Sequence, residues 1–190
     1  DWTRLTLGAG MAENEFLGNR LSGSFGHVKS SNTAYINIDY NRDIFGMNGF
    51  AQFAGGVTHS QVETKGSLLA GVSTILSSSW TVGAEIPTRQ TDDSAPSKIG
   101  FALSQPVTIE QGQLDYRIPV ARTKAGSVLY KHHAVDLKPA TRALNMASYY
   151  NQPLFDGRGH MRLYAEARGH LASGKHKRES RIGLEFLMAL

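Results

Sequence analysis

Residues 161–171 alternate strictly between apolar and polar side chains, and this pattern leaves few folds open. One phase holds only apolar or small residues: Met161, Leu163, Ala165, Ala167, Gly169 and Leu171. The other phase is polar throughout: Arg162, Tyr164, Glu166, Arg168 and His170. Successive side chains of a β-strand point to opposite faces, so the segment predicts a strand with one apolar and one polar face. A soluble sheet would turn the polar face outward, and a membrane barrel would turn the apolar face toward lipid. Alternation alone does not choose between them.

The same alternation recurs along the chain, and helical periodicity is nearly absent. Short polar connectors such as 41–43, 77–79, 110–112 and 124–126 separate the alternating segments. Regular short strands with turn signals between them predict an all-β, antiparallel up-and-down meander of about 10–12 strands that closes on itself. The expected strands are 4–11, 20–28, 33–42, 49–59, 66–76, 80–88, 98–108, 113–121, 127–137, 141–151, 161–171 and 182–190.

The composition of the chain argues against several classes of protein. Hydrophobic residues make up 41% and charged residues 19%, which argues against both a disordered chain and a strongly charged one. No apolar run approaches the roughly 18 residues that a membrane-spanning helix needs. Cysteine is absent, which excludes disulfides and thiolate ligands. The net charge of +4 suits an anionic lipid surface, and the chain lacks the aromatic and basic interleaving expected of a nucleic-acid-binding sheet.

Two prolines interrupt the strand patterns. Pro106 and Pro119 cannot donate to a ladder of hydrogen bonds, so residues 106–137 are predicted to contain bulges or to form a projecting hairpin. No internal repeat or long linker divides the chain, so residues 1–190 are expected to form one domain.

Five segments follow one another from residue 98 onward: 101–112 (FALSQPVTIEQG), 114–120 (LDYRIPV), 126–130 (GSVLY), 135–139 (VDLKP) and 142–150 (RALNMASYY). In their order and spacing they resemble the C-terminal translocator domain of subtilisin-like autotransporter serine proteases. Upstream of residue 98 the match is looser.

The resemblance implies a transmembrane β-barrel of about twelve strands in the outer membrane of a Gram-negative bacterium. It implies contact with outer-membrane lipid and lipopolysaccharide, the barrel-assembly machinery and the chain's own subtilase-like passenger. The family ends on Phe or Trp, whereas this chain ends on Leu190. The family also threads a helix through the pore, and nothing before Arg4 supplies one. Either that helix precedes residue 1, or the chain is not a complete translocator.

Two groups of residues are assigned roles on this basis. Charged residues on the wet face are expected to line the lumen, with the charges of 162–168 forming a ladder of ion pairs. They are Asp115, Arg117, Arg162, Glu166, Arg168 and Glu185. The terminal strand is expected to be the assembly signal, with its apolar phase facing lipid. That phase consists of Ile182, Leu184, Phe186, Met188 and Leu190. Four aromatic residues are expected at the membrane interfaces: Trp2, Trp80, Tyr149 and Tyr150.

No chemistry is expected of the segment itself. His132 and His133 are adjacent, so in a strand they face opposite sides and cannot share one metal ion. Ser104 and Glu166 could be combined with a histidine (His27 or His170) on paper, but no G-x-S-x-G segment occurs. No catalytic residue, metal or cofactor is therefore predicted. The basic run 175–178 is predicted to be a solvated loop or, if it is extracellular, a contact with lipopolysaccharide phosphates.

The connectors count against a membrane location. With the C-terminus in the periplasm, 88–98 and 153–159 are periplasmic, yet they are among the longer connectors, and outer-membrane barrels keep that side short. A soluble all-β module at the C-terminus of a secreted protease is therefore an alternative, and an outer-membrane barrel enzyme is a second one.

Overall fold

The computed structural model describes residues 1–13, 27–63, 67–88, 96–154, 158–171 and 179–188, and every regular element in them is a β-strand. The expected all-β fold with antiparallel sheets is confirmed. Eight strands form one sheet in the order β1-β2-β3-β5-β6-β9-β10-β11. Their bounds are β1 Trp2–Glu13, β2 His27–Ile44, β3 Met47–Glu63, β5 Ile75–Pro87, β6 Lys98–Gln111, β9 Arg142–Leu154, β10 Gly159–Leu171 and β11 Glu179–Met188.

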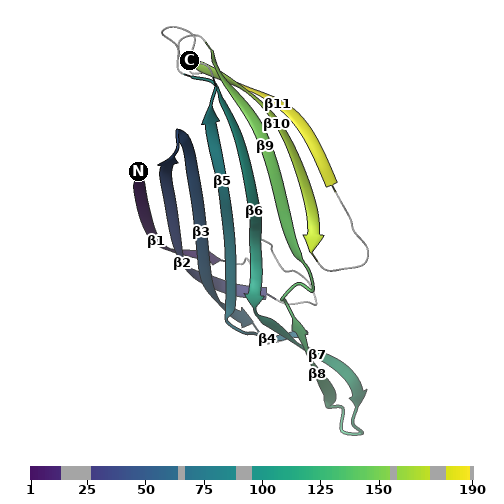
Figure 1. The fold of residues 1–190 in the computed structure, drawn as a ribbon. Coiled ribbons are helices and arrows are strands. Elements are labelled where there is room, and N and C mark those ends of the chain that lie inside the picture. Colours follow the sequence, from purple (N-terminus) through teal and green to yellow (C-terminus); the bar gives the residue numbers. More distant parts are fainter. Residues whose placement is uncertain (14–26, 64–66, 89–95, 155–157, 172–178, 189–190) are drawn as a thin grey trace.

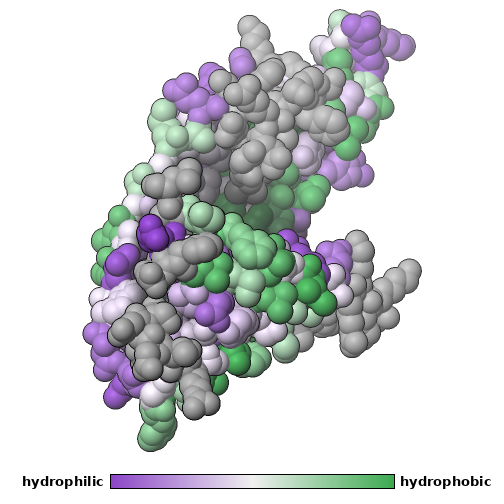
Figure 2. Space-filling view, turned by 90° about the horizontal axis from the view of Figure 1, so that it is seen from above, coloured by the Kyte–Doolittle hydropathy of each residue, from purple (hydrophilic) through white to green (hydrophobic). Residues whose placement is uncertain are grey.

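This main sheet is a single curved layer (Figure 1). Seen from above, the molecule is hollowed on one side (Figure 2). Apolar residues lie at the surface of the molecule in the view of Figure 2. Among the described residues no hydrogen bonds join β1 to β11, so the two strands are the edges of the sheet and no closed barrel is seen.

A second, three-stranded sheet has the order β4-β7-β8, with β4 at Leu69–Val72, β7 at Gln113–Arg122 and β8 at Val128–Asp136. The β7–β8 hairpin projects beyond the lower end of the main sheet (Figure 1). Pro119 lies at a register shift between β7 and β8, and Pro106 lies opposite a register shift in β5. A bulge tolerates proline because the local ladder is already interrupted there.

The buried apolar cluster of the described residues joins the two sheets. Leu69 and Leu114 come from the small sheet, and Val28 and Ile75 come from the main sheet. Leu69 is fully buried at 0% exposure. The cluster therefore holds the base of the side sheet against the lower end of the main sheet.

In two regions the chain is divided into strands differently from the prediction. Segment 66–76 is divided into β4 and β5, and Ser73 lies between these two strands in the sequence. Its amide donates to the Gln113 carbonyl at 3.0 Å, and its hydroxyl accepts from the Gln113 amide at 2.7 Å. Segment 33–42 extends into the longer strand β2, which takes in residues 27 and 28 of the expected strand 20–28; residues 20–26 lie outside the described part.

Aromatic rings lie over glycines of neighbouring strands on the polar face of the main sheet. A Cβ atom added to Gly100 would overlap the ring of Tyr149, and one added to Gly183 would overlap the ring of Tyr164. Gly8 stands in the same relation to Tyr35. Glycine is needed at these positions because the ring occupies the space of a side chain.

Candidate functional site

Two neighbouring rows of residues cross all eight strands of the main sheet and have opposite characters. Each row follows cross-strand partners from β1 to β11, and the two rows start one residue apart. The first contains no charged residue: Thr3, Tyr40, Ala51, Val82, Leu103, Met146, Ala167 and Ser180. The second is polar at every position: Arg4, Asp39, Gln52, Thr81, Ser104, Asn145, Arg168 and Glu179. The sheet therefore separates an apolar face from a polar face across its full width.

Side chains on the apolar face are the more exposed ones. Leu7 is 71% exposed, Phe186 is 61% exposed and Ile182 is 80% exposed. Along β2 the apolar phase is exposed from residue 32 to residue 42, while the polar phase is mostly half-buried. On a curved sheet, side chains spread apart on the convex side and converge on the concave side. The exposure pattern therefore assigns the apolar face to the convex side.

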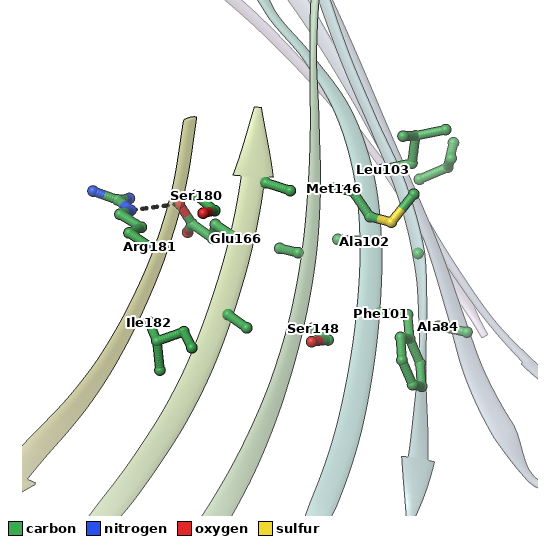
Figure 3. Close-up of a pocket in the computed structure, with 15 residues that line it drawn as sticks. Ala84, Phe101, Ala102, Leu103, Met146, Ser148, Glu166, Ser180, Arg181 and Ile182 are labelled. Atoms are coloured by element: carbon green, nitrogen blue, oxygen red, sulfur yellow. Dashed lines mark hydrogen bonds and ion pairs between the residues drawn. The ribbon is translucent and has the colours of Figure 1, made fainter. Parts of the chain in front are cut away.

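The apolar face carries a groove of about 1090 Å³ over β5, β6, β9, β10 and β11 (Figure 3). Small residues such as Ala84, Ser148 and Ala165 line it together with the larger Phe101 and Met146. Glu166 and Arg181 belong to the same strands, but their side chains lie on the polar face, where Arg181 Nε donates to Glu166 Oε2 at 2.7 Å. The groove therefore offers apolar contact rather than an acid or a base.

A hydrogen-bonded network occupies the polar face near the upper end of the sheet. The Tyr149 hydroxyl donates to Glu85 Oε1 at 2.7 Å, and Lys98 Nζ lies 3.3 Å from Glu85 Oε2. The Arg162 guanidinium lies over the Tyr149 ring, 4.4 Å from its centre. Four neighbouring strands are thereby linked by side chains as well as by their backbones.

At the lower end of the sheet, a second network spans β5, β6 and β9 and lies on the apolar face, since Ser78 shares the face of Trp80 and Arg142 that of Met146. Glu110 accepts a hydrogen bond from the Ser78 hydroxyl at 2.6 Å and forms an ion pair with Arg142 at 2.5 Å. Arg142 also donates to Gln105 Oε1 at 3.4 Å. The first network therefore makes the upper part of the polar face suited to contact with water and ions, and the second places an ion pair at the lower end of the apolar face.

Four of the six residues expected to line a lumen lie on this polar face. Arg162, Glu166 and Arg168 lie on β10, and Glu185 lies opposite Arg162 on β11. They do not form a ladder along β10: Glu166 bonds to Arg181 instead. Residues four apart along a strand are separated by roughly 13 Å, which is beyond the reach of an ion pair.

The other two expected residues lie elsewhere. Asp115 and Arg117 are on β7, in the side sheet rather than the main sheet. Arg117 Nε donates to the Ser67 carbonyl at 2.8 Å, and its guanidinium lies over the ring of Tyr130. The structure therefore does not place these two beside the other four, because the β7–β8 hairpin pairs with β4.

The predicted assembly signal lies on the exposed apolar face of the edge strand β11. Ile182, Leu184, Phe186 and Met188 share this face, while Leu187 lies on the opposite one. Leu190 lies outside the described residues, as does the basic run 175–178.

The expected aromatic positions divide between the two faces. Trp80 and Tyr150 lie on the apolar face, but Trp2 and Tyr149 lie on the polar face. Sequence reasoning missed the pairing of Tyr149 with Glu85. The alternation places both on the polar phase, but their contact depends on the register of three strands.

The described residues do not bring together the metal ligands or the serine and glutamate that were considered from the sequence. No group of three or more His, Cys, Asp or Glu side chains is close enough there to hold a metal ion. His132 and His133 lie on opposite faces of β8. Ser104 and Glu166 are separated by β9 and lie in different cross-strand rows.

Comparison of the chain with protein-family models, with curated proteins and with solved structures found no match. Within the described residues there is no helix long and apolar enough to cross a membrane.

Proposed function

We propose that this chain forms the wall of a transmembrane β-barrel in the outer membrane of a Gram-negative cell. The observation that carries the proposal is the pair of neighbouring rows, one without charge and one entirely polar, that cross all eight strands. Exposed apolar side chains across a whole sheet are unfavourable in water, and each Å² removed from water contributes roughly 25 cal/mol. A hydrocarbon layer removes that cost, and the polar face then lines a wet lumen.

Closure is part of the proposal. In hydrocarbon every backbone N–H and C=O group requires a partner, so open edges such as those of β1 and β11 are excluded there. The even number of antiparallel strands means that β1 and β11 run in opposite directions. They can therefore be joined directly or through an even number of further strands.

We further propose that the barrel is an autotransporter translocator, which exports or displays an N-terminal passenger of the subtilase type. The support is the resemblance of residues 98–190 to that family. The barrel-assembly machinery would insert it, with β11 as the assembly signal, and lipid and lipopolysaccharide would surround it. Any protease activity would belong to the passenger.

The membrane part is tested by a matched pair of variants on β6. Leu103→Arg places a charge on the apolar face near the middle of its strand, whereas Ser104→Arg places the same charge on the polar face. A charge toward hydrocarbon near the bilayer centre costs roughly 2–4 kcal/mol. We expect Leu103→Arg to block insertion into lipid vesicles, measured by protection from added protease, and Ser104→Arg to insert. Equal behaviour of the two variants would contradict the assignment of faces.

The export part is tested in cells. The chain is placed behind a signal peptide and a reporter passenger, and cleavage of the reporter by external protease is measured. We expect surface-exposed reporter from the parent chain and none from Leu103→Arg. A barrel that inserts but leaves its reporter inside the cell would contradict the translocator assignment alone.

A soluble all-β module is the second candidate, favoured by the unpaired edges of β1 and β11 and by the buried cluster around Leu69. It predicts a stable monomer in plain buffer without detergent, which gel filtration would detect. The membrane barrel predicts aggregation under the same conditions.

A further inference from the structure

The β7–β8 hairpin concentrates the positive charge of the chain. The hairpin, residues 113–136, contains four Lys or Arg residues and two Asp residues, and Lys138 follows β8. Residues 113–139 thus have a net charge of +3, while the whole chain has a net charge of +4. The five cations are Arg117, Arg122, Lys124, Lys131 and Lys138. Among the described residues, Lys124 and Lys131 have no hydrogen-bond or ion-pair partner, so both are available to an anionic ligand.

Exposed apolar side chains accompany these cations. Ile118, Val120, Leu129 and Val135 are all exposed, and Leu129 is 51% exposed. The register places Arg117 opposite His132 on one face of the hairpin and Ile118 opposite Lys131 on the other. One face of the hairpin therefore carries Arg117 and Arg122, and the other carries Lys131 beside Ile118 and Leu129. The hairpin stands clear of the main sheet (Figure 1).

Two local contacts hold the cationic tip in shape. Arg122 Nε donates to the Gly126 carbonyl at 2.9 Å, and the Ser127 amide donates to the Thr123 hydroxyl at 3.1 Å. Gly126 has a φ of 88°, which a residue with a Cβ atom rarely adopts. The turn that carries Lys124 is therefore a defined structure.

We propose that the β7–β8 hairpin binds the phosphate-bearing headgroups of an anionic lipid surface. This inference rests on the proposed function, which places the hairpin beside a bilayer. Lys and Arg residues near an anionic membrane contribute about 1 kcal/mol each, which corresponds to a factor of about five in binding. A free phosphate ion or a nucleic acid would leave Leu129 and Ile118 in water, whereas the boundary between headgroups and acyl chains accommodates both kinds of side chain.

The absence of cysteine permits a direct test with the full chain. Leu129→Cys is labelled with a dye whose emission depends on polarity, and the protein is inserted into vesicles of phosphatidylcholine alone or with phosphatidylglycerol added. Insertion is measured separately by protease protection. We expect the dye emission to move to shorter wavelength only with phosphatidylglycerol. In the background of Lys124→Glu with Lys131→Glu, the ratio of bound to free hairpin should fall by at least about fivefold per cation.

The matched control is Arg4→Glu with Lys29→Glu, which makes the same change in net charge at exposed positions of β1 and β2. It should retain the emission shift. Equal emission from both vesicle types in an inserted protein would overturn the inference and leave the proposed function standing. The same shift on neutral vesicles with added inorganic polyphosphate or DNA would overturn the assignment to lipid. A chain that inserts into neither vesicle would contradict the proposed function and this inference together.

Discussion

The main sheet exposes many of its large apolar residues, whereas the side sheet buries apolar residues at its base. In the main sheet, large apolar residues such as Leu7 and Ile182 lie exposed on one face. In the side sheet, Leu69 and Leu114 are buried against residues of the main sheet. The base of the side sheet is thus stabilised from within, as in a protein dissolved in water. The apolar face of the main sheet requires a covering from outside the described residues.

The largest expected effect concerns the base of the side sheet. Leu69→Ala removes a fully buried side chain and should cost about 2–5 kcal/mol in the free energy of unfolding of the side sheet. Hydrogen exchange on the folded protein should show lost protection in β7 and β8, with the main sheet unchanged.

The control is Leu129→Ala, which truncates the same residue type at an exposed position of β8. It should leave the free energy of opening that hydrogen exchange measures in β7 and β8 within about 0.5 kcal/mol of that of the parent chain. If Leu69→Ala also released protection across β9 to β11, the two regions would be one cooperative unit and the comparison would fail.

The second prediction concerns the edge strand of the main sheet. Phe186→Asp should abolish insertion and leave a protease-sensitive species, because it places a charge on the apolar face, which the proposed barrel turns toward lipid, at a cost of roughly 2–4 kcal/mol, less near an interface. Leu187→Asp, one residue along on the polar face, should be tolerated far better. Both are scored by insertion into vesicles. Equal damage from both would show that β11 does not separate lipid from water.

The third prediction concerns the polar network and is the smallest. Tyr149→Phe removes a hydrogen bond to the Glu85 carboxylate and should cost about 1.5–3 kcal/mol in the free energy of unfolding. Tyr150→Phe removes a hydroxyl that donates to the neutral Gln152 amide oxygen, and it should cost about 0.5–1.5 kcal/mol. Denaturant unfolding of the protein in detergent measures both. A larger loss from Tyr150→Phe would indicate that the Glu85 network contributes little to the main sheet.

The alternation of residues predicted much of the main sheet. It placed Arg162 and Glu166 on one face and Met161 and Leu163 on the other, as the structure has them. It also indicated most of the strands, because the direction of a side chain in a strand depends only on its position along that strand. The polar connectors marked several of the turns for the same local reason.

The sequence pattern did not predict which strands pair with each other. Asp115 and Arg117 show the same alternation as the residues of β10, yet they belong to a separate sheet. The exchange of hydrogen bonds between Ser73 and Gln113 helps to direct this chain segment away from the main sheet. These residues lie 40 positions apart in the sequence, so the local alternation of residues does not predict their contact.

The sequence by itself determined which side chains share a face, because that property follows from the period of two along each strand. Only the tertiary structure decided which residues meet across strands, such as Tyr149 with Glu85 and Arg181 with Glu166. It also decided that the side sheet stands apart and that Leu69 is buried while Leu7 is exposed. The physical reason is that contacts between strands depend on their order and register. Both are set by the sum of many distant hydrogen bonds and side-chain contacts rather than by any one segment.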